Sequence, residues 1–222
     1  MANCQRIRIS HNHIYNTPRA GINVNNGRYG GHLFEFNDVH DTVRETSDHG
    51  PFNSYGRDPY WCQHVCHPDS VPEGYPRCPG DRHHSFGTLE EITKYARETT
   101  VLRNNRFSAT RLGGNPRPGL QFGIDMDDGS ANYEVYGNLC VDLGIKTKEG
   151  SFIKCHDNII INGEIRLGNA NRDNHVVVEN NLDLWSPSAD TYAEYVRTHY
   201  MNGLEFGPTA EFPEWLRDRD VK

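Results

Sequence analysis

The stretch Gly123–Asp142, GIDMDDGSANYEVYGNLCVD, decides how this 222-residue chain is interpreted. Its first half gathers three carboxylates, Asp125, Asp127 and Asp128. Its second half, residues 133–142, is a short unit of alternating apolar residues that recurs along the chain. The repeated strand unit predicts a regular scaffold, and the acids beside it predict a functional site on that scaffold.

The repeated unit consists of two alternating apolar residues, then an asparagine, a skipped position and another apolar residue. The first copy is Ile7-Arg-Ile9-Ser-His-Asn12-His-Ile14, and the later copies carry Asn37, Asn105, Asn138, Asn158 and Asn180. Most steps between these asparagines are near twenty to thirty residues, the period of a solenoid of stacked coils. We expect each asparagine at a bend, with its amide bonded to the next amide along the stack. The alternative is an antiparallel sandwich with asparagine turns, which accounts less well for such similar units.

Composition excludes several classes of partner. Apolar residues make up 35% of the chain, charged residues 24%, and the formal net charge is −7. No basic cluster stands out, so we expect neither nucleic acid nor an anionic membrane as a partner. No apolar run is long enough to cross a bilayer. No secretory signal opens the chain, and the first unit begins at Ile7, so we expect a fragment of a longer protein.

Residues 56–98 interrupt the repeat and account for the long step between Asn37 and Asn105. This segment has five prolines in residues 56–84 and no period, which predicts an irregular insertion that walls a cleft. The pattern Thr88-Leu-Glu-Glu91 predicts a short helix near 88–97 that returns the chain to the stack. A zinc site within the insertion is one interpretation, and a single disulfide or free thiols is the other. The candidate ligands are Cys62, Cys66, Cys78, His64, His67, His83 and His84.

After Leu184 the repeat fades, and residues 186–222 are expected to form a capping segment. Asp190 can begin a helix that shields the last coil. Exposed terminal coils would instead allow end-to-end self-association. Cys140 and Cys155 fit small core positions. The outward histidines of the strand units are expected to face solvent, namely His11, His13, His40, His156 and His175.

Three strings resemble one uncharacterised branch of the pectin-lyase-like superfamily: Thr46–Asp58, Gly123–Asn132 and Gly144–Gly150. The resemblance covers most of the chain outside residues 56–98 and the C-terminal tail. It implies an all-β, right-handed parallel β-helix as a single domain over 1–222, with the insertion and short flanking helices. It also implies a secreted protein that degrades a polysaccharide. It carries over no catalytic residues, so the site rests on chemistry.

Hydrolysis of a glycosidic bond needs one protonated acid and one ionised carboxylate. The catalytic candidates are Asp48, Asp125, Asp127 and Asp128. We expect Asp127 or Asp128 to act with Asp48 or Asp125, although strand alternation places Asp128 on the opposite face from Asp125 and Asp127. Sugar sites combine carboxylates with aromatic rings. The substrate-binding candidates are His49, Arg57, Asp58, Tyr60, Trp61 and Lys146.

Two alternatives stay open beside the hydrolase. A polysaccharide lyase acting on a uronic-acid polymer would use Arg57, Lys146 or Lys148 as base or as the neutralising charge. Calcium bound by Asp125, Asp127 and Asp128 would assist it, although their spacing matches no standard calcium loop. We expect no other metal or cofactor. The second alternative is a non-catalytic carbohydrate-binding or structural β-helix, in which the aspartates form turns and ion pairs.

Overall fold

The computed structural model describes residues 4–25, 30–46, 49–55, 62–64, 83–84, 98–109, 122–127, 129–147, 152–167 and 176–185. All regular elements in these ranges are strands. The helices predicted near 88–97 and from Asp190, and the capping segment 186–222, lie outside these ranges. In the described part of the chain there is no helix that could cross a membrane.

Outside the insertion, the strands form three parallel sheets, and each coil adds one strand to each sheet, except that the last described coil adds strands to two of them only. Sheet 1 contains β1 (Arg8–Ser10), β4 (Leu33–Glu35), β9 (Thr100–Arg103), β12 (Tyr133–Tyr136), β15 (Ile153–His156) and β18 (Val177–Glu179). Sheet 2 contains β2 (His13–Ile14), β5 (Asp38–His40), β10 (Arg106–Ser108), β13 (Leu139–Val141), β16 (Ile159–Ile161) and β19 (Leu182–Leu184). Sheet 3 contains β3 (Ile22–Asn25), β6 (Phe52–Tyr55), β11 (Phe122–Asp127), β14 (Gly144–Thr147) and β17 (Ile165–Leu167).

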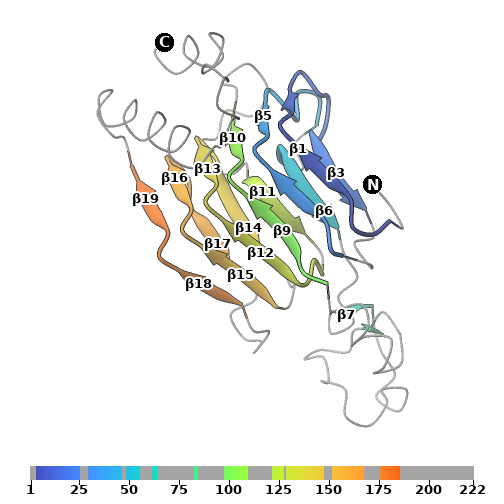
Figure 1. Ribbon diagram of the computed structural model, residues 1–222. Helices are drawn as coiled ribbons and strands as arrows, with labels where there is room; N and C mark the ends of the chain where they lie inside the picture. Colours follow the sequence, from blue (N-terminus) through green and yellow to red (C-terminus); the bar gives the residue numbers. More distant parts are fainter. Residues whose placement is uncertain are drawn as a thin grey trace.

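This strand order is that of a parallel β-helix, so the predicted all-β solenoid is confirmed at that level (Figure 1). Inside the predicted insertion, β7 (Cys62–His64) pairs antiparallel with β8 (His83–His84). These two short strands belong to none of the three sheets.

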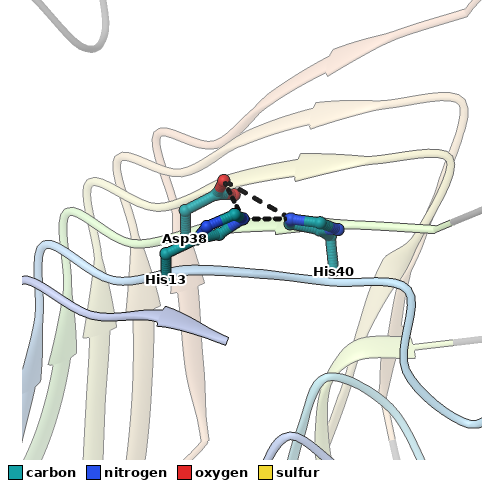
Figure 2. A group of neighbouring side chains, drawn as sticks. All are labelled: His13, Asp38 and His40. Atoms are coloured by element: carbon teal, nitrogen blue, oxygen red, sulfur yellow. Dashed lines mark hydrogen bonds and ion pairs between the residues drawn. The ribbon is translucent and has the colours of Figure 1, made fainter. Parts of the chain in front are cut away.

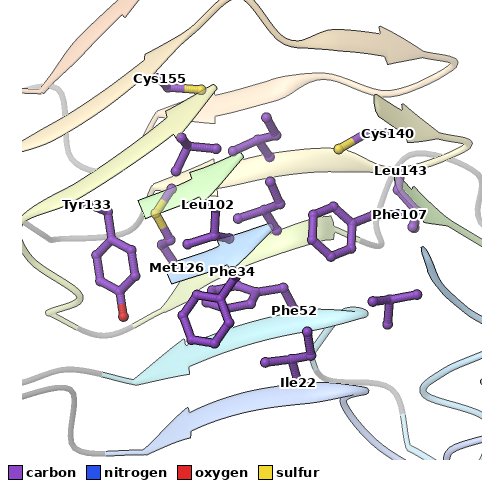
Figure 3. Packing of buried hydrophobic residues seen from close by; sticks show 14 of the residues in the cluster. Ile22, Phe34, Phe52, Leu102, Phe107, Met126, Tyr133, Cys140, Leu143 and Cys155 are labelled. Atoms are coloured by element: carbon purple, nitrogen blue, oxygen red, sulfur yellow. The ribbon is translucent and has the colours of Figure 1, made fainter. Parts of the chain in front are cut away.

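The core runs along the axis of the coils because alternate residues of every strand point inward. Phe34, Leu102 and Val135 lie in register on sheet 1 and are fully buried. The rings of Phe34 and Phe52 pack edge to face with centroids 5.2 Å apart, which joins sheet 1 to sheet 3 (Figure 3). Cys140 and Cys155 are buried in this core, as predicted, and burial raises the pKa of the Cys155 thiol to about 12.

The asparagine ladder is present, with one correction. Each Nδ2 donates to the Oδ1 of the asparagine in the next coil at 2.8–3.0 Å, along Asn12, Asn37, Asn105, Asn138, Asn158 and Asn181. The last member is Asn181 and not the predicted Asn180. The residue before each ladder asparagine has positive φ, and in the last coil that residue is Asn180, with φ of 54°. The bend therefore takes its left-handed residue one position earlier than predicted, and the ladder asparagine is free to hydrogen bond.

The strict alternation of apolar and polar residues fails on sheet 2. Leu139, Val141 and Ile161 occupy outward positions and are nonetheless buried. In the last described coil, Asp183 takes the inward position that Ile160 occupies one coil earlier. That coil also exposes Val177, Val178 and Leu182, and Trp185 directly after it.

Candidate functional site

Strand β11 carries two of the predicted catalytic residues on the outer face of sheet 3. Ile124 and Met126 point inward and are fully buried. Asp125 and Asp127 therefore share the outer face, as alternation requires. Asp128, which alternation would place on the other face, lies outside the described residues.

The two carboxylates meet the ammonium group of Lys146, which the next coil supplies from β14. Nζ of Lys146 lies 2.6 Å from Oδ1 of Asp125 and 3.1 Å from Oδ1 of Asp127. The side chains of Asp125, Asp127 and Lys146 are only 3%, 18% and 15% exposed. Lys146 also lies over the Phe122 ring, with Nζ 5.4 Å from the centroid. The cluster is thus partly desolvated, and Asp127 is its most accessible carboxylate.

The shared ammonium group limits the separation of the two carboxylates. Both Oδ1 atoms contact the same nitrogen, so they are no more than about 5.7 Å apart. The positive charge that a bound calcium ion would provide between Asp125 and Asp127 comes here from Lys146.

Strand pairing extends the cluster into a row of polar side chains along the helix axis. The row follows the register of β3, β6, β11, β14 and β17 and consists of Asn23, Asn53, Asp125, Lys146 and Arg166. Within it, Nδ2 of Asn53 donates to Oδ1 of Asn23 at 3.0 Å. A second row places Asn25, Tyr55 and Asp127 in register. Sequence reasoning missed Asn23 and Asn53, because their link to Asp125 comes only from the stacking of coils.

The turn after β11 holds Asp127 from behind. The carbonyl of Asp127 accepts hydrogen bonds from the backbone N–H of Ser130 at 2.9 Å and from its hydroxyl at 2.7 Å. Ser130 Oγ lies 2.7 Å from Ser54 Oγ on β6, and both residues are fully buried. Gly129 makes the turn with φ of 71°. The Asp127–Ser130 segment is therefore a turn, and this turn fixes the backbone of Asp127.

His49 is the other predicted substrate-binding residue that the structure describes. Its imidazole accepts a hydrogen bond from Nε of Arg19 at 3.0 Å. A Cβ on the adjacent Gly50 would lie 1.7 Å from the carbonyl oxygen of Phe122, so this segment packs directly against the start of β11. The Asp127 side of the site is at the other end of that strand. Arg19 was not predicted, and no sequence pattern singles it out.

The remaining candidates lie outside the described residues. These are Asp48, Arg57, Asp58, Tyr60, Trp61, Lys148 and the cysteine and histidine side chains of the insertion.

A second polar cluster, which sequence reasoning missed, lies on the outer face of sheet 2 and consists of His13, Asp38 and His40 (Figure 2). The prediction that the outward histidines face solvent is wrong for His40, which is 3% exposed. It is buried because His13 and Tyr15 of the preceding coil pack on its ring, with centroids 4.7 and 5.4 Å away. His13 itself remains partly accessible, with 29% of its side chain exposed.

The outer face of sheet 1 carries a buried acid that is paired with two arginines. Glu35 accepts hydrogen bonds from Arg103 at 2.6 and 2.8 Å, and Arg8 lies 2.5 Å away. Burial alone would raise the pKa of Glu35, but the two guanidinium groups outweigh it and lower that pKa. An acid held ionised in this way fits a structural ion pair.

The fold and the outer-face acids define a parallel β-helix with a candidate carboxylate site. Comparison of the chain with known proteins gives no match to a protein-family model, to a curated protein or to a solved structure. The function must therefore be inferred from the chemistry of the site itself.

Proposed function

We propose that this chain is a carbohydrate-active enzyme that cleaves glycosidic bonds of a polysaccharide on the outer face of sheet 3. The observation that carries the proposal is the pairing of Asp125 and Asp127 around Lys146. Three strings of the sequence resemble right-handed β-helices of the pectin-lyase-like superfamily, and we propose a secreted location on the basis of that resemblance.

The separation of the carboxylates favours a retaining glycoside hydrolase. Retaining enzymes place their two carboxyl groups about 5–5.5 Å apart, whereas inverting enzymes leave about 6.5–9.5 Å for a water molecule. The limit of about 5.7 Å set by Lys146 matches the retaining class.

The two carboxylates differ in environment, which suggests their roles. Asp125 lies closer to the ammonium group of Lys146, which favours its ionised form, so we assign it as the nucleophile; Asp127 lies farther from that charge and is more accessible, so we assign it as the acid. Its oxygen would form a bond to the anomeric carbon while the bond to the leaving oxygen breaks and Asp127 donates a proton to that oxygen. Water would then release the sugar, with Asp127 taking the proton back.

The polar rows beside the acids suit a chain-like ligand. Successive rungs of a parallel sheet are about 4.8 Å apart, so the row from Asn23 to Arg166 offers hydrogen-bonding groups at regular intervals along the helix axis. The amides of Asn23 and Asn53 can bond sugar hydroxyls, and the Tyr55 ring lies in register with Asp127. A linear polysaccharide is the ligand class that such a row fits best.

A lyase is the second candidate, and one observation favours it. Arg166 is exposed and lies in register with Lys146, so two cations occupy adjacent rungs next to the acids. Such a pair could neutralise the carboxylate of a uronic acid, the charge that must be compensated before its α-proton is removed.

Digestion of a panel of neutral and acidic polysaccharides tests the proposal. Products are followed by a reducing-end assay and by the absorbance of unsaturated uronic acid. New reducing ends without that absorbance are expected. Absorbance of unsaturated uronic acid among the products would show elimination and would make the chain a lyase. Sugar binding without cleavage, unchanged in Asp125→Asn and Asp127→Asn, would make the chain a binding module and overturn the enzyme proposal.

A further inference from the structure

The three side chains of the second cluster converge because of the register between β2 and β5. His13 pairs with Asp38, and Ile14 pairs with Val39, which is fully buried in the core. The residues on either side of Val39, Asp38 and His40, therefore share the outer face with His13. Figure 2 shows both imidazole rings and the Asp38 carboxylate directed at one point.

We propose that His13, Asp38 and His40 form a binding site for a divalent transition-metal ion, with zinc as the ion that fits best. Two neutral imidazoles and one carboxylate are the ligand set of open zinc sites, in which a fourth position holds water. The site is distinct from the acids of sheet 3 and does not depend on the proposed carbohydrate chemistry.

The distances match those of a zinc site. Nε2 of His13, Nε2 of His40 and Oδ2 of Asp38 form a triangle with sides of 2.5, 3.8 and 3.9 Å. The point equidistant from the three atoms lies about 2.0 Å from each, the usual length of Zn–N and Zn–O bonds. Tetrahedral angles would place each pair of ligand atoms about 3.3 Å apart, so the His13 ring would have to move away from His40 by less than about 1 Å and the Asp38 oxygen would have to approach both nitrogens by about 0.5 Å. His13 is the most exposed of the three and can make that adjustment.

The surroundings prepare the ligand atoms. Nδ1 of His40 lies 2.8 Å from Oδ2 of Asp41. A carboxylate only accepts hydrogen bonds, so Nδ1 of His40 carries the proton and its Nε2 presents a lone pair to the centre. Carboxylate–histidine contacts of this type orient the ligands of most zinc sites.

Asp38 divides its two oxygens between different partners. Oδ1 lies 3.9 Å from Nε of the buried Arg106, and Oδ2 is the atom that lies near both imidazoles. The positive charge of Arg106 helps to keep Asp38 ionised, the form in which a carboxylate binds a metal ion. The partly exposed His13 side supplies the entry path and the open fourth position.

Zinc binding by the full-length chain tests the site, with His13→Ala as the variant. His13 is exposed, so its loss should leave the fold intact, which far-UV circular dichroism verifies. His156→Ala is the matched control, because His156, like His13, stacks on a tyrosine and has a carboxylate near its Nε2. Among the described residues, His156 belongs to no group of three side chains that could hold a metal ion.

After removal of bound metal with a chelator, zinc uptake is measured by equilibrium dialysis and calorimetric titration. Zinc that binds elsewhere on the chain binds the wild type and all the variants alike, so it does not affect the difference between them. We expect the wild type and His156→Ala to bind one equivalent more than His13→Ala. Asp41→Asn, which can keep the left-handed backbone at this position, should weaken the same site about 10–100-fold. Equal zinc binding by the wild type and His13→Ala would overturn the site, as would an equal loss in His156→Ala.

Discussion

Removal of the Asn105 side chain should be among the most destabilising single changes in this fold. Asn105 is fully buried in the middle of the ladder. Its Nδ2 donates to the carbonyls of Phe34 and Arg103 and to Oδ1 of Asn138, at 2.9–3.0 Å. Its Oδ1 accepts from the backbone and side-chain nitrogens of Asn37 at 3.0 and 2.9 Å. One side chain thus connects three successive coils.

The magnitude follows from these contacts. Each buried hydrogen bond contributes about 1 kcal/mol net, and a group left without a partner costs more. The NH2 group of Asn105 has two hydrogens for its three acceptors, so Asn105→Ala removes the equivalent of about four bonds, and we expect the free energy of unfolding to fall by about 4 kcal/mol. This is a large part of the roughly 5–15 kcal/mol that stabilises a typical domain.

Two comparison variants separate hydrogen bonding from packing. Asn12→Ala changes the exposed end of the ladder, where water can replace the lost bonds, and should cost less than about 1 kcal/mol. Asn105→Asp keeps the volume but turns an oxygen toward three acceptors, so it should cost at least as much as Asn105→Ala. Urea unfolding followed by far-UV circular dichroism measures all three. The reasoning would be refuted if the free energies of unfolding of Asn105→Ala and Asn12→Ala differed by less than about 1 kcal/mol. It would also be refuted if Asn105→Asp were as stable as the wild type.

Three further variants test other contacts. Gly137→Ala should lower the free energy of unfolding by about 1–2 kcal/mol. Gly137 has φ of 62°, and a Cβ there would lie 2.5 Å from Oδ1 of Asn104. An unchanged midpoint of thermal unfolding would contradict this prediction. The arginine partners of Glu35 lower the pKa of its carboxyl group in the folded state. The stability that this ion pair contributes is therefore fully present above the ordinary glutamate pKa of about 4.3, and it is lost as the pH falls through the lower pKa of the folded state. The stability gap between the wild type and Glu35→Gln should therefore narrow below about pH 4, and a gap independent of pH would argue against the ion pair. Lys146→Met should lower the free energy of unfolding by more than about 1 kcal/mol, because it leaves two adjacent carboxylates poorly solvated and without their cation. Lys154→Met breaks an exposed pair with Glu179 and should cost less. Equal losses of stability in the two variants would refute this expectation.

The repeat could be predicted from the sequence because one physical requirement recurs in every coil. Each bend needs a side chain that bonds the backbone and its own copy in the next coil, and asparagine meets both needs. The last rung was misassigned because two asparagines stand together at 180 and 181, and the pattern alone does not show which one takes the left-handed φ. Alternation likewise placed Asp125 and Asp127 correctly on one face.

The partners of the site residues could not be predicted, because coils of unequal length conceal the register. Lys146 reaches Asp125 only once β14 is stacked on β11, and Asn53 reaches the same row from the other side. His13 and His40 are 27 residues apart and meet for the same reason. In the sequence each is an isolated outward histidine, although Asp38 and His40 stand two residues apart on one strand, with side chains of the kind that bind metal ions.

The loss of activity in Asp127→Asn tests the proposed function most directly. Asp157→Asn is the control, since Asp157 is an exposed acid at the bend directly after β15, with 59% of its side chain accessible. On a polysaccharide that the wild type cleaves, we predict that Asp127→Asn forms new reducing ends at least about 100-fold more slowly, the scale of a lost general acid. Asp157→Asn should match the wild type. Wild-type activity in Asp127→Asn, in a protein whose fold is unchanged, would contradict the assignment of this site.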